Sequence, residues 1–214
     1  MENEKKKNNL QEQPVEFYTQ KYREADPAEI AARLQIPFDA EKDCFTVRMF
    51  KKTYSVNWPE FGYAMIEEGP NTYDPLARDN GARILMLRYL LFANPTPETG
   101  SFISFRDMPS GDLYIQPFQG RCIMRTNRKY GTRKEVFCKV CEKAGAAAGK
   151  GGDASYDIEV FDGIFVRFII WEGDDEFPAS SQILFSENIR TAFETYDLAE
   201  MGGIILNMMG ALEA

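Results

Sequence analysis

The acidic segment from Trp171 to Pro178 holds the side chains of this sequence best suited to chemistry. It reads Trp-Glu-Gly-Asp-Asp-Glu-Phe-Pro and lies between residues 164–170 and 182–185, two apolar runs that predict buried strands. A polar loop presented by a rigid scaffold is a common place for a binding site. The candidate ligand-binding residues of this loop are Trp171, Glu172, Asp174, Asp175 and Glu176.

A hairpin is predicted to bring further acidic side chains toward this loop. Asp162-Gly163 is the signal of a two-residue turn between two strand-like runs. That turn would place Asp153 and Asp157 near the far end of the strand pair, beside the loop. Converging carboxylates could hold Mg²⁺ or Ca²⁺, or supply an acid–base pair. From the residues alone, the favoured interpretation is a solvated turn in which Asp174 or Asp175 caps the backbone, and we assign no metal to it.

The absence of histidine excludes several kinds of active site. Neither a Ser-His-Asp or Cys-His catalytic group nor a His-ligated zinc or haem can be built from this chain. The four cysteines, with no secretion signal, predict reduced thiols in the cytoplasm. Cys138 and Cys141 form a CxxC motif, but redox motifs of this kind work at a helix N-terminus, and this pair falls inside a predicted helix. We therefore predict a packing role, with redox or metal function as the alternative.

The charge distribution bears on the choice of partner. A net charge of −8 argues against general affinity for nucleic acid, and no apolar run is long enough to span a bilayer, so we predict neither as a partner. The segment from Arg121 to Lys143 is the exception, with eight Lys or Arg against two Glu. Such a segment is usually a solvated helix face, although it could also bind an anion or a protein partner.

The periodicity of apolar residues predicts an α+β fold with a mainly antiparallel sheet, a central buried helix and a C-terminal packing helix. Alternation over residues 45–58 predicts a hairpin. Residues 79–93 are apolar nearly all round, which predicts the central helix, and an apolar stripe from residue 195 predicts the packing helix. Residues 1–13 are predicted to be a disordered leader and residues 14–214 a single domain.

The middle of the chain predicts shorter helices and a linker. Residues 118–130 and 132–147 are expected to be helical, after a turn at residues 109–112. Residues 145–152 are rich in Gly and Ala. They follow a helix and precede a strand, the opposite of the order in a phosphate-binding loop, so we expect a flexible connector.

Two large side chains carry predictions of their own. Arg88 interrupts the apolar central helix, so its guanidinium must reach water along its aliphatic stem or meet a carboxylate; we expect the first. Trp171 ends a strand that is predicted to be buried, and we expect its ring to turn inward and cover the core beneath the acidic loop.

Several segments together are typical of one family. They are the acidic motif at residues 171–178, Gly152-Asp153-Ala154-Ser155-Tyr156, Ile103-Ser104-Phe105-Arg106, Leu87-Arg88-Tyr89-Leu90 and Ile183-Leu184-Phe185. On these segments, and from about Pro27 to the C-terminus, the chain resembles the prokaryotic family of domain of unknown function 3786.

The resemblance implies a group that occurs mainly in anaerobic bacteria and archaea and has no established activity or cofactor. Some members are expected to carry an additional Cys-rich iron–sulfur module at the N-terminus, and we expect this chain to be without it. The matched segments add Asp153, Tyr156 and Arg88 to the candidate ligand-binding residues. Relatives commonly have histidine at the position of Arg88, and the CxxC motif is not a feature of the family.

Three hypotheses about function follow. The first is an accessory module of anaerobic prokaryotes that binds a small molecule or cofactor; a roomy, aromatic-lined pocket would favour it. The second is an Asp/Glu-dependent hydrolase or transferase, with or without Mg²⁺, which convergent carboxylates in a closed cavity would favour. The third is a protein-partner-binding module that uses the basic segment from Arg121 to Lys143, which an uncovered apolar face would favour. Whether the protein is an enzyme stays open at this point.

Overall fold

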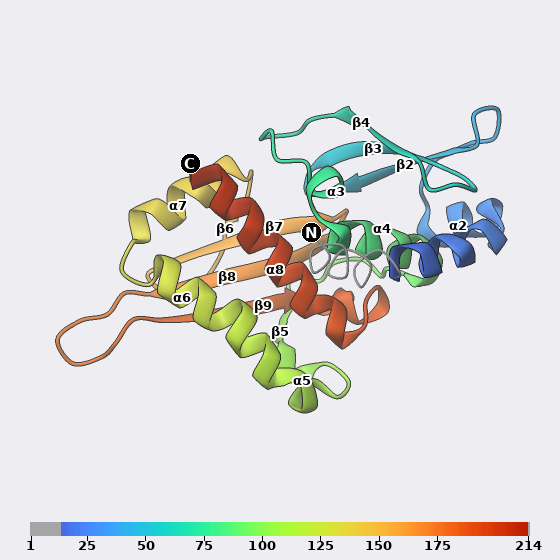
Figure 1. The fold of residues 1–214 in the computed structure, drawn as a ribbon. Helices are drawn as coiled ribbons and strands as arrows, with labels where there is room; N and C mark the ends of the chain where they lie inside the picture. Colours follow the sequence, from blue (N-terminus) through green and yellow to red (C-terminus); the bar gives the residue numbers. More distant parts are fainter. Residues whose placement is uncertain (1–13, 214) are drawn as a thin grey trace, which may run out of the picture.

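The computed structural model describes residues 14–213 (Figure 1). The leader predicted for residues 1–13 lies outside this range. Residues 14–24 are helical, and the further α-helices are α2 (Pro27–Leu34), α3 (Pro75–Arg78), α4 (Asn80–Phe92), α5 (Gly111–Phe118), α6 (Met124–Tyr130), α7 (Lys134–Lys143) and α8 (Thr195–Glu213). Two 3₁₀ turns, η1 (Phe105–Asp107) and η3 (Glu187–Thr191), and one π-helical turn, η2 (Gln119–Ile123), complete the helical elements of this range.

The strands of the described range form one antiparallel sheet in the order β4-β3-β2-β7-β8-β9-β5, with β1 on β2 and β6 on β7. They are β1 (Phe38–Asp39), β2 (Cys44–Met49), β3 (Lys52–Asn57), β4 (Tyr63–Glu67), β5 (Phe102–Ser104), β6 (Ala147–Ala148), β7 (Ala154–Phe161), β8 (Ile164–Trp171) and β9 (Ser180–Ser186). The predicted α+β class with an antiparallel sheet is therefore confirmed, and both predicted hairpins, β2–β3 and β7–β8, are present.

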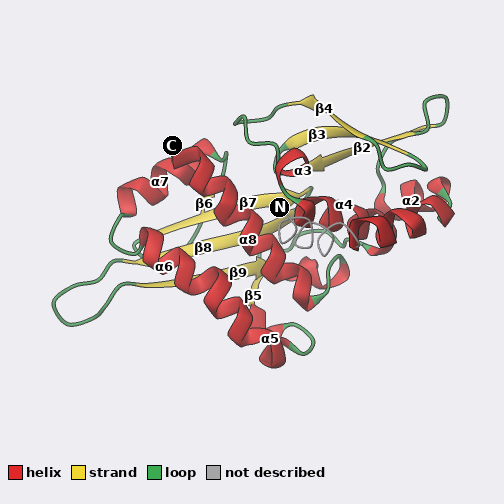
Figure 2. Cartoon of the chain, in the orientation of Figure 1, coloured by secondary structure: helices red, strands yellow, loops and turns green. Residues whose placement is uncertain are grey.

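Helices cover one face of the β7-β8-β9 part of the sheet. Figure 2 shows α5 to α8 lying across these strands, with α8 in the middle. Strand register places Tyr156, Phe168 and Ile183 side by side, as the two-residue period requires. The packing helix α8 approaches closely at Gly202, where a Cβ atom would lie 2.8 Å from Cys122 Sγ. Among the described residues, no helix combines the length and apolarity needed to cross a membrane.

The central helix α4 is buried as predicted, and both of its ends are capped. Asp79 is its N-cap, and the Asp79 carboxylate accepts the Gly81 N–H at 2.8 Å. At the other end, the Arg33 guanidinium donates to the carbonyl groups of Leu90, at 2.6 Å, and of Ala93. The last carbonyl groups of a helix have no partner within it, so Arg33 ties α2 to the end of α4.

An aromatic stack joins α4 to the sheet. The rings of Tyr89 and Phe161 are stacked with centroids 4.2 Å apart, and Phe193 lies 5.4 Å from Phe161. Phe161 also faces Met49 in the one register pair that joins β2 to β7 in the described range. The two parts of the sheet and the chain before α8 thus meet at one cluster of rings.

The helix predicted for residues 118–130 begins earlier than expected. The turn signal at residues 109–112 is the start of α5 at Gly111, where a Cβ atom would lie 2.3 Å from the Phe105 carbonyl oxygen. Pro117 lies inside α5, and the π-helical turn η2 follows directly. Because proline lacks the N–H that continues an α-helical ladder, Pro117 predicts a break, and the sequence did not indicate that the helical residues continue on both sides of it.

Candidate functional site

The acidic loop between β8 and β9 is a capped turn. Its Asp174 Oδ1 accepts the N–H groups of Glu176, at 2.9 Å, and of Phe177, at 2.7 Å. The Asp174 N–H donates in turn to the Phe177 carbonyl oxygen at 2.9 Å. The backbone hydrogen bonds from Phe177 and Glu176 lower the pKa of Asp174. Asp174 therefore caps the backbone of its own turn, which is one of the two alternatives predicted from the residues. Asp175 and Glu176 are exposed.

The base of the loop holds two more candidates, which have partners of their own. Glu172 pairs with Lys134 at 2.5 Å, and the Glu172 N–H donates to Asp153 Oδ2 at 2.8 Å. Asp157 is further along β7 and makes two hydrogen bonds, of 2.6 and 2.7 Å, with Arg167. In the part of the chain that the structure describes, no three or more Asp, Glu or Cys side chains are grouped so that they could hold a metal ion.

The inward position predicted for the Trp171 ring is wrong. Trp171 is 36% exposed, whereas the preceding Ile170 is fully buried. Strand β8 continues to Trp171, which pairs with Ser180, so the two-residue period turns the Trp171 side chain away from the covered face.

Truncating Trp171 should therefore cost little stability. We expect Trp171→Ala to destabilise the protein much less than Phe168→Ala, because Phe168, three residues earlier on β8, is fully buried and loss of such a ring costs about 3–5 kcal/mol. Urea unfolding of the two variants measures the difference. Equal losses of stability would contradict the exposed position of Trp171.

Tyr156 belongs to a different cluster, on α7. Its hydroxyl donates to Glu142 Oε1 at 3.1 Å, and its ring meets Phe137 edge-on. Burial, with Cys138 and Glu142 nearby, raises the pKa of Tyr156. Cys138 is half-buried in the middle of α7, and burial raises the pKa of the Cys141 thiol well above its ordinary value. The position of the CxxC motif inside a helix is as predicted, and both cysteines are free thiols.

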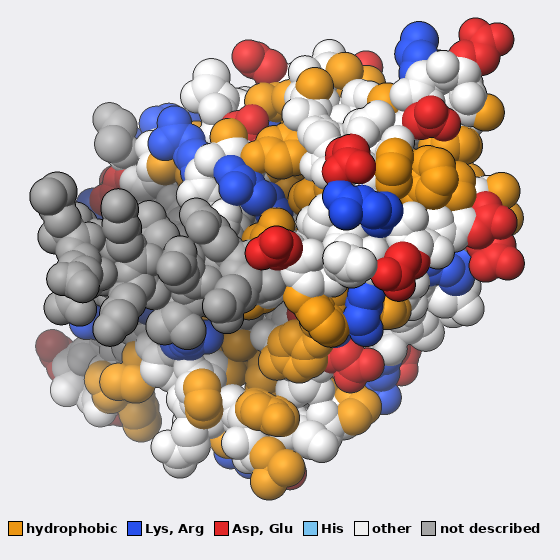
Figure 3. Space-filling view, turned by 45° about the vertical axis from the view of Figure 1, so that its right-hand side comes forward, with side chains coloured by type: hydrophobic (Ala, Val, Ile, Leu, Met, Phe, Trp, Pro, Cys, Tyr) orange, Lys and Arg blue, Asp and Glu red, His pale blue; other side chains and the backbone are white. Residues whose placement is uncertain are grey.

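Side chains of the basic segment from Arg121 to Lys143 form ion pairs and a hydrogen bond with the C-terminal end of α8. Glu213 pairs with Lys129 at 3.0 Å and with Arg133 at 2.5 Å, and Lys143 Nζ donates to the Leu212 carbonyl oxygen at 2.8 Å. These contacts hold α6 and α7 against α8. On the face drawn in Figure 3, outside the grey atoms, apolar side chains form separate groups with side chains of both charge signs between them. A partner surface on the basic segment stays a prediction.

We expected the Arg88 guanidinium to reach water along its aliphatic stem. In the structure it meets a carboxylate instead. Arg88 is 7% exposed, and its Nε lies 2.8 Å from Oδ1 of Asp197, which is 2% exposed and belongs to the first turn of α8. Arg88 Nη1 donates to the Tyr18 hydroxyl at 2.6 Å. Burial raises the pKa of Asp197, and the positive charge of Arg88 opposes that rise. Asp197 Oδ2 also accepts the Glu194 N–H at 3.0 Å.

Aromatic rings surround the guanidinium of Arg88. Its central carbon lies 4.5 Å from the ring centroid of Tyr196, 5.3 Å from that of Tyr18 and 5.6 Å from that of Phe92. Cations over aromatic faces are attracted by the ring quadrupole. Together with Asp197 and Tyr18, these rings hold the Arg88 side chain in one orientation.

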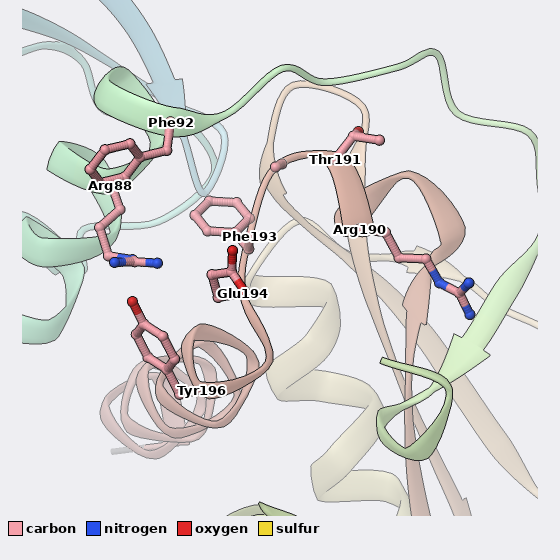
Figure 4. A pocket seen from close by; sticks show the side chains of 8 residues that line it. Arg88, Phe92, Arg190, Thr191, Phe193, Glu194 and Tyr196 are labelled. Atoms are coloured by element: carbon pink, nitrogen blue, oxygen red, sulfur yellow. The ribbon is translucent and has the colours of Figure 1, made fainter. Parts of the chain in front are cut away.

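This guanidinium lines a cavity of about 490 Å³ between the end of α4 and the start of α8. The lining residues are Arg88, Phe92, Arg190, Thr191, Ala192, Phe193, Glu194 and Tyr196. Figure 4 shows the Arg88 guanidinium and the Tyr196 hydroxyl pointing toward each other, with the Glu194 carboxylate facing the same space. The Arg190 guanidinium points away from it. We call this cavity the Arg88 pocket.

The structure thus divides the predicted site residues among separate places. The acidic loop lies at the opposite end of the sheet from α4 in Figure 1, so Arg88 shares no site with it. Sequence reasoning missed Asp197, Glu194 and Tyr196. One signal was available for Asp197: an arginine in an apolar helix needs a carboxylate, and Asp197 is in the first turn of the other strongly apolar helix.

Comparison with known proteins bears out the resemblance. A search of curated proteins and a search of solved structures found no match. A family model does match residues 26–208, which include both the acidic loop and the Arg88 pocket. The chain therefore belongs to the family described as domain of unknown function DUF3786.

Proposed function

We propose that this protein binds a small molecule that carries an acidic group, and that the Arg88 pocket is its binding site. The observation that carries the proposal is a buried guanidinium that lines a cavity. Arg88 Nε and Nη1 are engaged by Asp197 and Tyr18, while Nη2 has no hydrogen-bond acceptor among residues 14–213. The planar guanidinium suits a carboxylate or phosphate group.

The walls of the pocket support a ligand with a flat apolar part. Phe92, Phe193 and Tyr196 present aromatic rings to the cavity, and its volume of about 490 Å³ is in the range usual for small-molecule sites. Because Arg88 is already oriented by its protein contacts, little side-chain freedom is lost when a ligand binds. These features favour the hypothesis of a small-molecule-binding module.

The same geometry favours binding over acid–base catalysis. A hydrolase of the predicted kind would direct two carboxylates at one substrate. The acidic side chains at the Arg88 pocket are Glu194 and Asp197, and both Asp197 oxygens are engaged, one by Arg88 and one by the Glu194 N–H. Glu194 is left as a single carboxylate facing the cavity.

Titration calorimetry with 3-phenylpropanoate, an aromatic carboxylate, tests the proposal. We expect Arg88→Met combined with Asp197→Asn to bind at least about tenfold more weakly than the native chain, because a hydrogen bond to a charged group contributes about 1.5–3 kcal/mol. The double variant removes both buried charges, and the asparagine introduced at position 197 keeps an acceptor for the Glu194 N–H. Its unfolding curve confirms that it is folded.

Arg190→Gln is the matched control. It removes a cation from the pocket lining, but the Arg190 guanidinium points away from the cavity, so affinity should change by less than about twofold. Equal affinity of the native chain and the double variant for an aromatic carboxylate would refute the proposed site, and so would failure of the native chain to bind any aromatic compound that carries a carboxylate.

A further inference from the structure

We infer that the ligand of the Arg88 pocket is amphoteric: it carries a carboxylate and a primary ammonium group beside a flat ring, as an aromatic amino acid does. The inference rests on the proposed binding function and adds the charge pattern of the ligand. It comes from the two charged groups that face the cavity, the guanidinium of Arg88 and the carboxylate of Glu194.

Glu194 is a carboxylate with no ion-pair partner in the described part of the chain. Its backbone is held, because its N–H donates to Asp197 Oδ2 at 3.0 Å, but no Lys or Arg of residues 14–213 pairs with its side chain. In Figure 4 it faces the same space as the Arg88 guanidinium. Glu194 is an exposed residue, so its carboxylate is free to pair with the ammonium group of a ligand whose carboxylate meets Arg88.

A ligand with only negative charge fits the pocket less well. Asp197 already balances Arg88 from the protein side, so a simple anion would meet the negative charge of Glu194, an exposed residue that faces the same cavity. The other cation of the lining, Arg190, points away, and its charge acts instead on Asp107, whose pKa is lowered chiefly by hydrogen bonds with Ser104. Like charges held a few ångströms apart disfavour binding.

The nearby lysine does not change this balance. Lys21 Nζ lies 4.8 Å from the ring centroid of Phe17 and 5.8 Å from that of Phe92, but Lys21 is not among the residues that line the cavity. The groups that face the ligand are therefore one cation, one anion and aromatic rings. This set matches a zwitterion with an aromatic side chain.

Three compounds that differ by one group each test the inference by calorimetry at about pH 7. Phenylalanine has both charges, 3-phenylpropanoate lacks the ammonium group, and 2-phenylethylamine lacks the carboxylate. We expect phenylalanine to bind at least about tenfold more tightly than either, since each missing group leaves a charged protein group without its partner.

Glu194→Gln locates the group that recognises the ammonium. In this variant the advantage of phenylalanine over 3-phenylpropanoate should disappear, while 3-phenylpropanoate itself should bind as well as before or better, because a like charge has been removed. Glu187→Gln is the matched control. Glu187 is an exposed glutamate on η3, outside the lining of the Arg88 pocket, and its loss should leave the preference unchanged.

The outcomes separate this inference from the proposed function. If 3-phenylpropanoate binds and phenylalanine binds no more tightly, the amphoteric ligand is refuted and the binding site stands. If phenylalanine keeps its advantage in Glu194→Gln, the role assigned to Glu194 is refuted. If none of the three compounds binds the native chain, the proposed function fails together with the inference.

Discussion

Replacing Arg88 with methionine is expected to destabilise the protein by about 3–5 kcal/mol, because Asp197 would remain buried without its counter-charge. Asp197 is 2% exposed and Arg88 Nε is 2.8 Å from it. Removing one partner of a buried ion pair costs more than removing both, since an unpaired buried charge loses its hydration without compensation. Arg88→Met combined with Asp197→Asn should therefore recover most of the lost stability. Urea unfolding measures both variants.

The pH dependence of Arg88→Met gives an independent check. Burial already raises the pKa of Asp197 against the opposing charge of Arg88, so loss of Arg88 should raise it further. The folded state would then hold a proton that the unfolded state releases, and stability should increase as the pH falls from about 8 toward the ordinary pKa of aspartate.

The pH dependence of the stability of Arg88→Met is compared with that of the native chain, because the other titratable groups contribute equally to the two proteins. The double variant should lose the additional slope because the amide that replaces the Asp197 carboxylate does not titrate. A single variant whose stability changes with pH in the same way as that of the native chain would show that Asp197 is not the buried partner of Arg88.

Phe161→Ala is the second change with a large expected effect, a loss of about 3–5 kcal/mol. Phe161 is 1% exposed and stacks on Tyr89 with ring centroids 4.2 Å apart. It also faces Met49 at the register pair between β2 and β7. The cavity left by its ring would loosen the place where the two parts of the sheet and α4 meet.

The same change should weaken ligand binding at the Arg88 pocket. Phe193 lines that pocket and lies 5.4 Å from Phe161, centroid to centroid, so its ring would lose support on one side. Phe168→Ala is the control, because Phe168 is equally buried but belongs to β8, whereas the ring partners of Phe193 are Tyr89 and Phe161. We expect similar losses of stability from the two variants and reduced affinity from Phe161→Ala alone. Equal affinity in both would show that the stack does not support the pocket.

Most elements of this fold could be predicted because their signals are local. The alternation in β2 and β3, the Asp162-Gly163 turn and the apolar run of α4 each involve residues close together in sequence. The two strands of a hairpin are antiparallel, so the predicted hairpins also predicted a mainly antiparallel sheet. The start of α5 at Gly111 was missed because it shows only turn residues.

Side-chain direction was harder to predict than secondary structure. The strand ending at Trp171 was recognised. Neighbouring residues of a strand point to opposite faces of the sheet, and a strand with apolar residues on both faces does not indicate which face the helices cover. Pairing of Trp171 with Ser180 and burial of Ile170 settle it in the structure. Asp174 was easier, because an aspartate that caps its own turn needs only neighbours in sequence.

The amino-acid sequence excluded imidazole chemistry and was enough to predict the fold class and the family, but for Arg88 it left two alternatives, water or a carboxylate. The packing of the folded chain shows that the partner of Arg88 is Asp197, 109 residues away in the chain, and that Glu194 and Tyr196 face the same cavity. A buried charge requires a counter-charge, but any of several acidic residues could supply it. Which one does so depends on how α8 packs against α4, and no local pattern encodes that contact.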